Sequence, residues 1–273
     1  MLLEKLLSGK FRKHSEQLNK FVAGFFDADG SIYIYEDRGN IGLRASIGQS
    51  ASKDPDFEVM RALQKHYNLG RIIYYLPPDG ENQASACMWN LSTTDSKKLY
   101  NLIGKHLLIK ATHFENLIWI QEECKGCPVK GDIREFSDCS RKHSKYLKRP
   151  KHISWAYAAG YIAGDGHLRC KTYKRSNSQY PANRLDIYVA SGDEIIVQLF
   201  QESFKGNTRF SERDNTFMWY RGLGKHNTLF AMKFLPKIRK YMLLKTKRNV
   251  IDRMLDFHRL PTETKCVESK DMR

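Results

Sequence analysis

The sequence has little cysteine and proline and no long hydrophobic run. Its 6 cysteines and 8 prolines are spread over 273 residues, which is too few cysteines for a disulfide framework and indicates a reducing compartment. No stretch reaches the roughly 18 consecutive apolar residues that cross a membrane. Residues 1–13 lack the continuous apolar region of a secretion signal. These absences predict a globular protein with no membrane partner.

Acidic residues are also scarce relative to basic ones. The chain has 30 Asp and Glu against 46 Lys and Arg, so its formal net charge is +16. A field of this sign and size attracts polyanions, nucleic acids above all. A basic protein without such a partner would have the same balance, so charge alone does not decide the function. Hydrophobic residues make up 41% of the chain, enough for one large or two medium-sized cores.

Two segments of the chain resemble each other closely enough to indicate an internal repeat. The first, FVAGFFDADG, occupies residues 21–30, and the second, YAAGYIAGDG, occupies residues 157–166. Both contain Ala-Gly, two large apolar residues, two small or acidic residues and a final Asp-Gly, whose aspartates are Asp29 and Asp165. Because a repeat determines the whole architecture, two copies of one fold are predicted.

The residues that follow each motif also repeat one pattern of strands and helices. In the first half, the periodicity predicts strands over 31–35, 43–49, 71–75 and 87–91 and helices over 57–67 and 111–122. In the second half, it predicts strands over 167–173, 185–190, 208–211 and 217–221, a helix ending near 204 and another over 247–258. The fold class is therefore α+β, with two pseudo-symmetric αββαββα halves over residues 1–123 and 153–273 and a basic linker over 124–152.

A leucine-rich run ending in lysine precedes the last helix of each half. The runs are HLLIK, which ends at Lys110, and YMLLK, which ends at Lys245. The motif aspartate and this lysine are separated by 81 residues in the first half (110 − 29) and by 80 in the second (245 − 165). The matched spacing predicts that Lys110 and Lys245 occupy equivalent places.

These residues resemble the LAGLIDADG homing endonucleases of the single-chain kind, which carry two motif copies. The resemblance covers nearly the whole chain, including both motifs, the strand order and both lysines. It implies that the strands of the two halves form a saddle-shaped, DNA-binding β-sheet surface. The second motif has Ala163 where the first acidic residue of the family pattern usually lies. That position is variable in the family, so the departure does not put activity in doubt.

Small residues on the motif helices indicate how the two halves would meet. Gly24 and Gly160, each next to an alanine, leave little side-chain bulk on one helix face, so the two backbones can come into contact. That packing would place Asp29 and Asp165 side by side at the helix C-termini, where the helix dipole adds further negative charge. Such a cluster needs cations, and hard oxygen ligands favour Mg²⁺, for which Mn²⁺ can substitute.

The resemblance also assigns roles around the aspartate pair. It makes Asp29 and Asp165 the catalytic metal ligands and adds metal ligands from the backbone carbonyls of the preceding residues, Ala28 and Gly164. Three further side chains complete the expected catalytic set. Lys110 and Lys245 would lie beside the metal-bound water and the phosphate, and Gln49 would order water in the active site.

Residues that alternate along the strands are the candidates for contacts with DNA bases. In the first half these are Tyr33, Tyr35, Arg44, Ser46, Arg71 and Trp89. In the second half they are Arg169, Lys171, Tyr173, Arg184, Asp186, Tyr188, Arg209, Arg213, Trp219 and Arg221. Some of these would instead pack under helices, and the tyrosines and tryptophans are the first candidates for that position.

The linker contains a possible zinc site. Cys124, Cys127, Cys139 and His143 have the spacing C-x2-C-x11-C-x3-H, which suits tetrahedral zinc. The family does not require zinc, and a spacing match within a polar linker can be accidental. Linker zinc is therefore an open alternative and not an expected cofactor.

The expected function is metal-dependent hydrolysis of both strands of a long, asymmetric DNA target by a monomer, which supports mobility of the host intron. One alternative on the same fold is an RNA maturase that assists splicing of a group I intron, with intron RNA as partner. The other is a non-catalytic DNA-binding protein. The intact aspartate pair favours the nuclease, since maturases that have lost cleavage often lose it. The resemblance implies a chloroplast or mitochondrion, with a phage or prokaryotic cytoplasm as alternatives.

Overall fold

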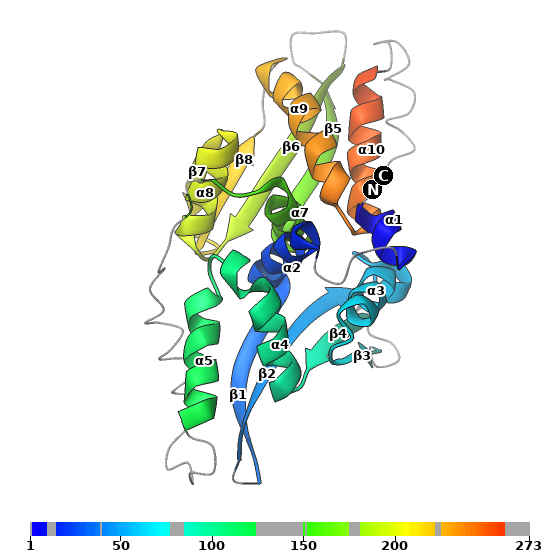
Figure 1. The fold of residues 1–273 in the computed structure, drawn as a ribbon. Helices are drawn as coiled ribbons and strands as arrows, with labels where there is room; N and C mark the ends of the chain where they lie inside the picture. Colours follow the sequence, from blue (N-terminus) through cyan, green and yellow to red (C-terminus); the bar gives the residue numbers. More distant parts are fainter. Residues whose placement is uncertain are drawn as a thin grey trace.

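The structure is a computed structural model that describes residues 2–9, 15–38, 40–76, 85–123, 150, 152–174, 181–221 and 225–259 (Figure 1). It consists of two halves with the same architecture, each built on a four-stranded antiparallel sheet. The linker residues that carry the possible zinc ligands Cys124, Cys127, Cys139 and His143 lie outside the described residues.

Helices and strands follow the same order in both halves. The first half contains α2 (Glu16–Asp29), β1 (Gly30–Asp37), β2 (Asn40–Ser50), η1 (Pro55–Phe57), α3 (Glu58–Tyr67), β3 (Arg71–Tyr75), β4 (Ala86–Leu91), α4 (Thr93–Ile103), η2 (Gly104–His106) and α5 (Ala111–Glu123). The second half contains α7 (Trp155–Asp165), β5 (Gly166–Lys174), β6 (Pro181–Ser191), α8 (Glu194–Phe204), β7 (Asn207–Ser211), β8 (Thr216–Arg221), α9 (Lys225–Tyr241) and α10 (Lys245–Arg259).

The two sheets share one topology. Their strand orders are β1-β2-β4-β3 and β5-β6-β8-β7, so each strand of one half has a counterpart in the other. The α+β class and the repeated strand order predicted from the sequence are therefore confirmed. Helices α4 and α9, whose bounds were not predicted from the sequence, lie between the last strand and the last helix of each half.

The motif helices α2 and α7 lie against each other at the centre of the molecule (Figure 1). A Cβ atom added to Gly24 would lie 2.1 Å from the carbonyl oxygen of Tyr157, and one added to Gly160 would lie 1.9 Å from that of Phe21. Each glycine therefore admits the backbone of the other helix where no side chain would fit. The close approach predicted from the small residues is confirmed.

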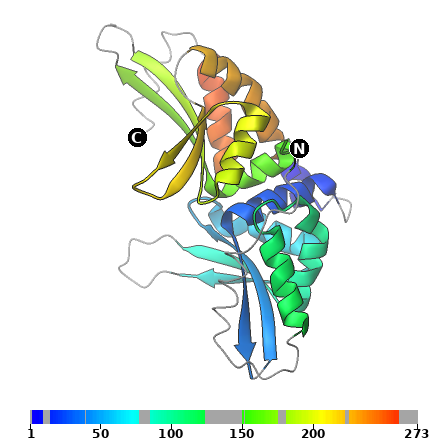
Figure 2. The same cartoon turned by 90° about the vertical axis from the view of Figure 1, so that its left-hand side faces the viewer.

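Within the described ranges, each sheet carries its helices on one face only. Figure 2 shows the helices of both halves on one side of the molecule and the strands on the other. Alternate residues of the central strands point toward the helices and form the core, namely Leu43, Ala45, Ile47, Leu185, Ile187 and Val189. We call the opposite, helix-free side of the two sheets the open face; its described side chains include Tyr33, Arg44, Arg71, Arg169 and Arg209.

A short N-terminal helix, α1 (Leu2–Leu7), connects the two halves on the helical side. It packs against α3 of the first half and α9 of the second and buries Leu2, Leu3 and Leu6. The carboxylate of Glu4 forms an ion pair of 3.3 Å with Arg248 of α10. Helix α1 was not predicted from the sequence, because two leucine pairs in a short segment do not establish a helical period.

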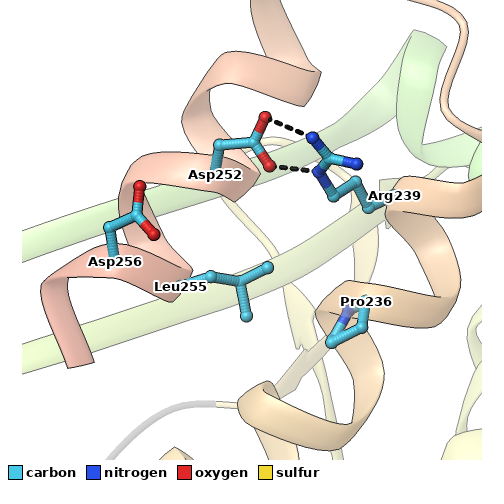
Figure 3. A pocket seen from close by; sticks show the side chains of 5 residues that line it. All are labelled: Pro236, Arg239, Asp252, Leu255 and Asp256. Atoms are coloured by element: carbon cyan, nitrogen blue, oxygen red, sulfur yellow. Dashed lines mark hydrogen bonds and ion pairs between the residues drawn. The ribbon is translucent and has the colours of Figure 1, made fainter. Parts of the chain in front are cut away.

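Helices α9 and α10 are joined by an ion pair on the same side of the molecule. Nη2 of Arg239 lies 2.9 Å from a carboxylate oxygen of Asp252, beside a surface pocket also lined by Pro236, Leu255 and Asp256 (Figure 3). This pocket lies away from the motif helix C-termini and takes no part in the candidate site. Among the described helices, none is long and apolar enough to span a membrane.

Candidate active site

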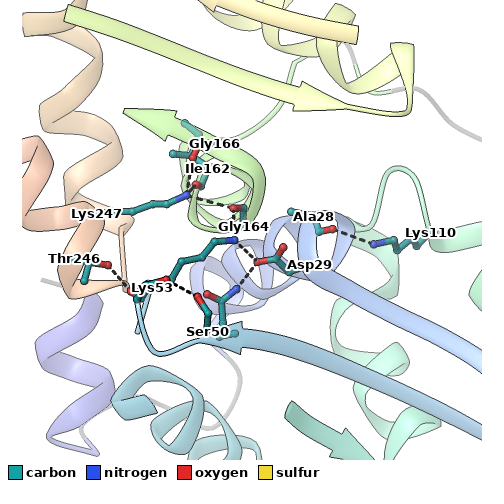
Figure 4. A network of polar contacts seen from close by, with 12 residues as sticks. Ala28, Asp29, Ser50, Lys53, Lys110, Ile162, Gly164, Gly166, Thr246 and Lys247 are labelled. Carbon is teal, nitrogen blue, oxygen red and sulfur yellow. Dashed lines mark hydrogen bonds and ion pairs between the residues drawn. The ribbon is translucent and has the colours of Figure 1, made fainter. Parts of the chain in front are cut away.

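Asp29 and Asp165 are the last residues of α2 and α7, and the two helices end side by side (Figure 4). A Cβ atom added to Gly164 would lie 3.0 Å from the carboxylate carbon of Asp29. The pKa of Asp165 is raised, first by burial and then by the negative charge of Asp29. The structure therefore brings the two predicted carboxylates together in one electrostatic environment.

Gln49 lies on β2 and contacts the first aspartate directly. Its side-chain Nε2 donates a hydrogen bond to Oδ2 of Asp29. Its Oε1 atom is buried and has no hydrogen-bond partner within the described part of the chain. A buried oxygen with an unused lone pair is available to a ligand or to an ordered water. Gln49 thus lies beside the first motif, at the position predicted from the sequence.

Lys53 also belongs to the site, although it was not among the residues predicted from the sequence. Its ammonium group lies 3.0 Å from the carbonyl oxygen of Gly164 and 3.5 Å from Oδ2 of Asp29 (Figure 4). The backbone carbonyl of Lys53 accepts a hydrogen bond from the hydroxyl of Thr246, so the second half holds this loop of the first. Lys53 has no counterpart at matched spacing in the repeat, so a comparison of the two copies could not have revealed it.

Lys110 lies at the C-terminal end of α2 and caps this helix. Its Nζ donates hydrogen bonds to the carbonyls of Phe26 at 2.9 Å, Asp27 at 2.8 Å and Gly30 at 2.6 Å. It also lies 3.5 Å from the carbonyl of Ala28, one of the expected metal ligands. A cation at a helix C-terminus offsets the partial negative charge of the exposed carbonyls.

The predicted equivalence of Lys110 and Lys245 is wrong. Lys245 is exposed and begins α10, whereas the ammonium of Lys247 binds the C-terminal carbonyls of α7. Lys247 donates to the carbonyls of Ile162, of Gly166 at 2.7 Å and of Gly164 at 3.4 Å. These three residues are the counterparts of Phe26, Gly30 and Ala28, the residues that bind Lys110.

The error has a simple geometric cause. The run before the last helix ends in Lys110 in the first half, where α5 begins at Ala111. In the second half α10 begins at Lys245 itself, so the side chain that reaches back to the motif comes from the first helical turn. The spacing from Asp165 to Lys247 is 82 residues (247 − 165), and that from Asp165 to Lys245 is 80. Both differ by one residue from the 81 between Asp29 and Lys110, so spacing alone cannot decide which lysine is the counterpart of Lys110.

The electrostatics of Lys247 differ from those of an ordinary surface lysine. Burial lowers the pKa of Lys247 to about 7, and the charge of Lys53 acts in the same direction, while Asp29 and Asp165 oppose both effects. The cluster thus contains two carboxylates and the three amino groups of Lys53, Lys110 and Lys247. Part of the cationic charge that the aspartate pair was expected to draw from metal ions is supplied by lysines.

The environments of the two aspartates are not equivalent. The strand register pairs Ile47 with Trp89 and Val189 with Trp219, which makes Ser191 the counterpart of Gln49. The hydroxyl of Ser191 accepts a hydrogen bond from the backbone of Asp193. Asp165 makes no hydrogen bond or ion pair with the residues that the structure describes, in contrast to Asp29 with Gln49 and Lys53. The pseudo-symmetry of the fold therefore does not extend to the polar groups of the site.

The oxygen atoms at this junction fit a hard divalent cation that keeps part of its water shell. They are the carboxylates of Asp29 and Asp165, the carbonyls of Ala28 and Gly164, and the unpaired amide oxygen of Gln49. No cluster of three or more His, Cys, Asp or Glu side chains that could hold a metal occurs among the described residues. The pair suits Mg²⁺, which takes its further ligands from water and phosphates instead of a closed protein cage.

Several predicted DNA contacts of the first half lie on the open face. Tyr33 is paired with Arg44 across β1 and β2, and the Arg44 guanidinium lies 4.6 Å from the ring centroid of Tyr35. Arg71 is exposed on β3. Ser46 has the same strand phase but is only 2% exposed, and its hydroxyl is hydrogen-bonded to that of Ser31 at 2.8 Å.

The second half presents a similar array on its open face. Arg169 is exposed and pairs with Asp186, which is itself buried. Tyr188 stacks on His167 with ring centroids 4.4 Å apart. Arg209 and Arg213 are exposed on β7 and in the turn after it. The remaining predicted contacts Lys171, Tyr173 and Arg184 lie on β5 and β6, but their side chains are outside the described part.

Three predicted DNA contacts are wrong because their strand phase points them toward the helices. Trp89 and Trp219 are both 0% exposed. Their indole nitrogens donate to backbone carbonyls, that of Trp89 at 2.8 Å to Leu69 and that of Trp219 at 2.7 Å to Lys205. Arg221 pairs with the buried Ile187 on β6.

The guanidinium of Arg221 also makes contacts on the helical side. It lies 4.1 Å from the ring centroid of Phe230 on α9 and donates to the carbonyl of Phe204. If the two tryptophans had been assigned to the core, the residues predicted to face DNA on β4 and β8 would have shifted by one position. That phase selects Asn90 and Tyr220, which face the open side and were missed.

Two pseudo-symmetric αββαββαα halves, joined through paired motif helices with an aspartate at each C-terminus, define the LAGLIDADG fold in its single-chain form. Solved structures of such proteins match this chain over nearly its whole length. The I-SmaMI LAGLIDADG homing endonuclease bound to cleaved DNA is 16% identical, with 93% of this chain and 96% of that chain covered and a TM-score of 0.65. The LAGLIDADG meganuclease I-AabMI bound to uncleaved DNA is 14% identical, with 93% and 97% covered and a TM-score of 0.68.

A third solved structure, the I-LtrWI LAGLIDADG homing endonuclease bound to target DNA, is 15% identical, with 94% and 98% covered and a TM-score of 0.62. I-SmaMI has also been solved bound to an uncleaved DNA target in the presence of calcium ions. No protein-family profile and no curated protein sequence matches the chain. At these identities, the likeness establishes the fold.

Proposed function

We propose that this protein is a homing endonuclease that makes a double-strand break in a long, asymmetric DNA target by divalent-metal-dependent hydrolysis. The observation that carries the proposal is the pair Asp29 and Asp165, adjacent at the ends of two contacting helices and surrounded by Lys53, Lys110 and Lys247. Two carboxylates and several cations at one junction suit phosphodiester hydrolysis. The shared fold with DNA-bound endonucleases supports the same conclusion.

The expected partner is duplex DNA lying along the open face of both sheets. Arginines on that face, such as Arg44, Arg71, Arg169 and Arg209, can bind phosphates or guanine edges. Because both motif copies are in one chain, a monomer has two similar but non-identical surfaces for the two half-sites. An asymmetric target follows from the different side chains of the two halves.

Mg²⁺ or Mn²⁺ would be held by the carboxylates of Asp29 and Asp165 and the carbonyls of Ala28 and Gly164. When bound, such an ion supplies Lewis acidity and lowers the pKa of coordinated water. The chain's own residues orient and stabilise the reacting groups. Gln49 fixes the orientation of the Asp29 carboxylate, and the ammonium groups supply positive charge where negative charge develops on a phosphate.

The proposal can be tested on DNA of random sequence, so the target does not have to be known. The purified protein is incubated with a DNA library of randomised sites and Mg²⁺, and the ends of cut molecules are sequenced. Mg²⁺ should give double-strand breaks at one enriched site, EDTA none, and Ca²⁺ binding without cutting, since Ca²⁺ activates water poorly.

Two variants connect cleavage to the aspartate pair. Asp29→Asn and Asp165→Asn should each abolish double-strand breaks at the selected site and retain DNA binding. Full double-strand cutting by either variant would contradict the proposed mechanism. A site selected by binding but never cut would favour a non-catalytic DNA-binding protein.

Intron mobility and an organellar location are part of the same proposal. A homing endonuclease encoded by an intron cuts the sequence formed when the flanking exons are joined. Sequencing the gene on either side of this reading frame gives that joined sequence, and the enriched site from the library should match it. A chloroplast or mitochondrial genome would carry that gene, and an unrelated target would contradict the mobility proposal.

A further inference from the structure

Asp27 is a buried carboxylate that the proposed reaction does not use, and it has an unusually complete set of donors. It lies two residues before Asp29 on α2 and is 3% exposed. Its Oδ2 accepts hydrogen bonds from the backbone of Leu108 at 2.7 Å and from the hydroxyl of Tyr157 at 2.7 Å. Its Oδ1 accepts one from the backbone of Lys110 at 3.0 Å.

These hydrogen bonds fix the loop that carries Lys110. The backbone N–H of Ile109 lies 3.4 Å from the same carboxylate, so three successive N–H groups, those of residues 108–110, point at one side chain. The ammonium of Lys110 then reaches the carbonyls of Phe26 and Gly30. Backbone and side chain of Lys110 are thus both tied to the last turn of α2, and the loop cannot shift without breaking several bonds at once.

The fourth donor comes from the other half of the molecule. Tyr157 lies in the first turn of α7, and its buried hydroxyl bonds Asp27 across the junction. Burial and the nearby charge of Asp27 raise the pKa of Tyr157, so the phenol stays protonated and remains a donor. The position of the Lys110 loop therefore depends on the packing of the second motif helix.

The second half shows that the motif helix does not need this carboxylate to form or pack. Ala163 is the counterpart of Asp27, and α7 still packs against α2 along its length. An alanine side chain cannot accept hydrogen bonds from a loop. In the second half, Lys247 reaches the C-terminal carbonyls of α7 from the first turn of α10 instead. Since burying a carboxylate is unfavourable unless it is fully bonded, its presence in one half indicates a task that this half alone requires.

We propose that Asp27 is a positioning residue for Lys110, and that the Tyr157 hydroxyl couples this positioning to the contact between the two halves. The proposal rests on the proposed endonuclease function, in which Lys110 lies beside the scissile phosphate. Asp27 itself touches no reacting atom and acts through the lysine.

The test uses Asp27→Asn and Tyr157→Phe in the full-length protein, with Tyr67→Phe as a matched control. Tyr67 is a partly buried tyrosine whose hydroxyl also bonds a residue of α2, Asn19 at 2.8 Å, but far along the helix from the aspartate pair. Single-turnover cleavage of the selected DNA target is measured with the two strands labelled separately, and DNA affinity is measured in Ca²⁺.

Asp27→Asn should lower the single-turnover rate constant by about 10- to 100-fold, because small displacements of a catalytic group have effects of that size. Tyr157→Phe should lower it by about 3- to 10-fold, since one of four bonds is lost. DNA affinity should change less than about twofold in both, and Tyr67→Phe should cut at the wild-type rate. In a Lys110→Met background, Asp27→Asn should have no further effect, because residues that act through one group are not additive.

Wild-type cleavage by Asp27→Asn, or an undiminished effect in the Lys110→Met background, would overturn the inference. If Asp27→Asn does not fold, the cleavage rate of Tyr157→Phe is compared with that of Tyr67→Phe as the same test. Amide hydrogen exchange gives a readout that does not require activity. Protection of the Leu108 and Lys110 amides should fall in Asp27→Asn and Tyr157→Phe and stay unchanged in Tyr67→Phe; unchanged protection in all three would also overturn it. A wild-type protein that cuts no DNA would refute the proposed function while this exchange result stands by itself.

Discussion

The lysines around Asp29 and Asp165 reach the site from three separate segments. Lys53 comes from a loop after β2, Lys110 from the loop before α5, and Lys247 from the first turn of α10. Each ammonium binds carbonyls at the end of a motif helix, where the helix dipole is negative. The role of a lysine here is thus determined by where its side chain ends and not by its place in the sequence repeat.

At the residue scale, Lys247→Met and Lys245→Met form a matched pair of neutralising substitutions on one helix. Lys247→Met removes the cation from the α7 carbonyls and should lower cleavage by about 10-fold or more, as does loss of a charge-stabilising group in other enzymes. Lys245→Met should cut at nearly the wild-type rate, since its side chain is exposed. Single-turnover cleavage measures both. The reverse order of the two effects would make Lys245, and not Lys247, the functional counterpart of Lys110.

At the element scale, the strand phase determines which arginines can reach DNA. Arg209 is exposed on the open face, with its guanidinium 5.6 Å from the ring centroid of Tyr220. Arg221 lies on the neighbouring strand in the opposite phase, over the ring of Phe230. A shift of one residue along a strand thus moves a side chain from the open face, where it can bind phosphate, to the helical side, where it stabilises the core.

The two arginines should therefore respond differently to removal. Arg209→Ala should weaken DNA binding by about 5- to 10-fold, the loss of one phosphate or base contact, and leave the melting temperature unchanged. Arg221→Ala should destabilise the fold by about 1 kcal/mol, through loss of its cation–π and hydrogen-bond contacts. Binding titrations and thermal unfolding distinguish the outcomes; an equal loss of DNA affinity from both would show that Arg221 reaches the duplex.

The packing of α2 against α7 is the second feature that belongs to the element scale. Gly24→Ala would place a Cβ 2.1 Å from the carbonyl oxygen of Tyr157, and backbone cannot move aside as a side chain can. We expect destabilisation by about 1–3 kcal/mol from overpacking, and slower cleavage because the helix ends that carry the aspartates move apart.

Gly192→Ala is the control for that substitution. A Cβ at Gly192 meets nothing within 4 Å, so stability and cleavage should stay close to wild type. Urea unfolding and single-turnover cleavage report the two quantities. If Gly24→Ala behaved like Gly192→Ala, the direct backbone contact between the motif helices would be contradicted.

At the scale of the whole molecule, charge and pseudo-symmetry act together. The net charge of +16 is carried by a chain whose two sheets lie on the same side of the molecule, opposite the helices (Figure 2). In the proposed function, a single chain with this geometry would bind a duplex along the open face of both sheets. The proposed function therefore predicts both an electrostatic attraction to DNA and the stoichiometry of binding.

DNA binding should be steeply salt-dependent and should involve one protein per duplex. Several lysines and arginines on phosphates would give a log–log slope of the affinity against salt concentration on the order of −5 or steeper. Fluorescence titrations at several KCl concentrations give the slope, and light scattering of the complex gives the stoichiometry. A nearly flat slope would place the positive charge away from DNA, and two protein copies per duplex would contradict a monomer.

Local patterns in the sequence were sufficient to predict the repeated halves, most strand positions and the aspartate pair. Strand β3 was predicted with its observed bounds, residues 71–75, and α5 to within one residue. Gly24 and Gly160 indicated the helix contact because a residue without a side chain lets the backbone of another helix come close. These features were predictable because each depends on residues close together in the sequence or on a spacing that the two copies of the fold share.

Tertiary structure decided which side chains meet at the site. Lys53 and Lys247 reach the motif carbonyls only because the loop after β2 and the start of α10 are folded against the junction. The inward phase of Trp89 and Trp219 was likewise fixed by the helices that cover one face of each sheet. Sequence periodicity shows that residues alternate, but which alternate set is buried depends on what packs against the sheet, and that is a property of the whole fold.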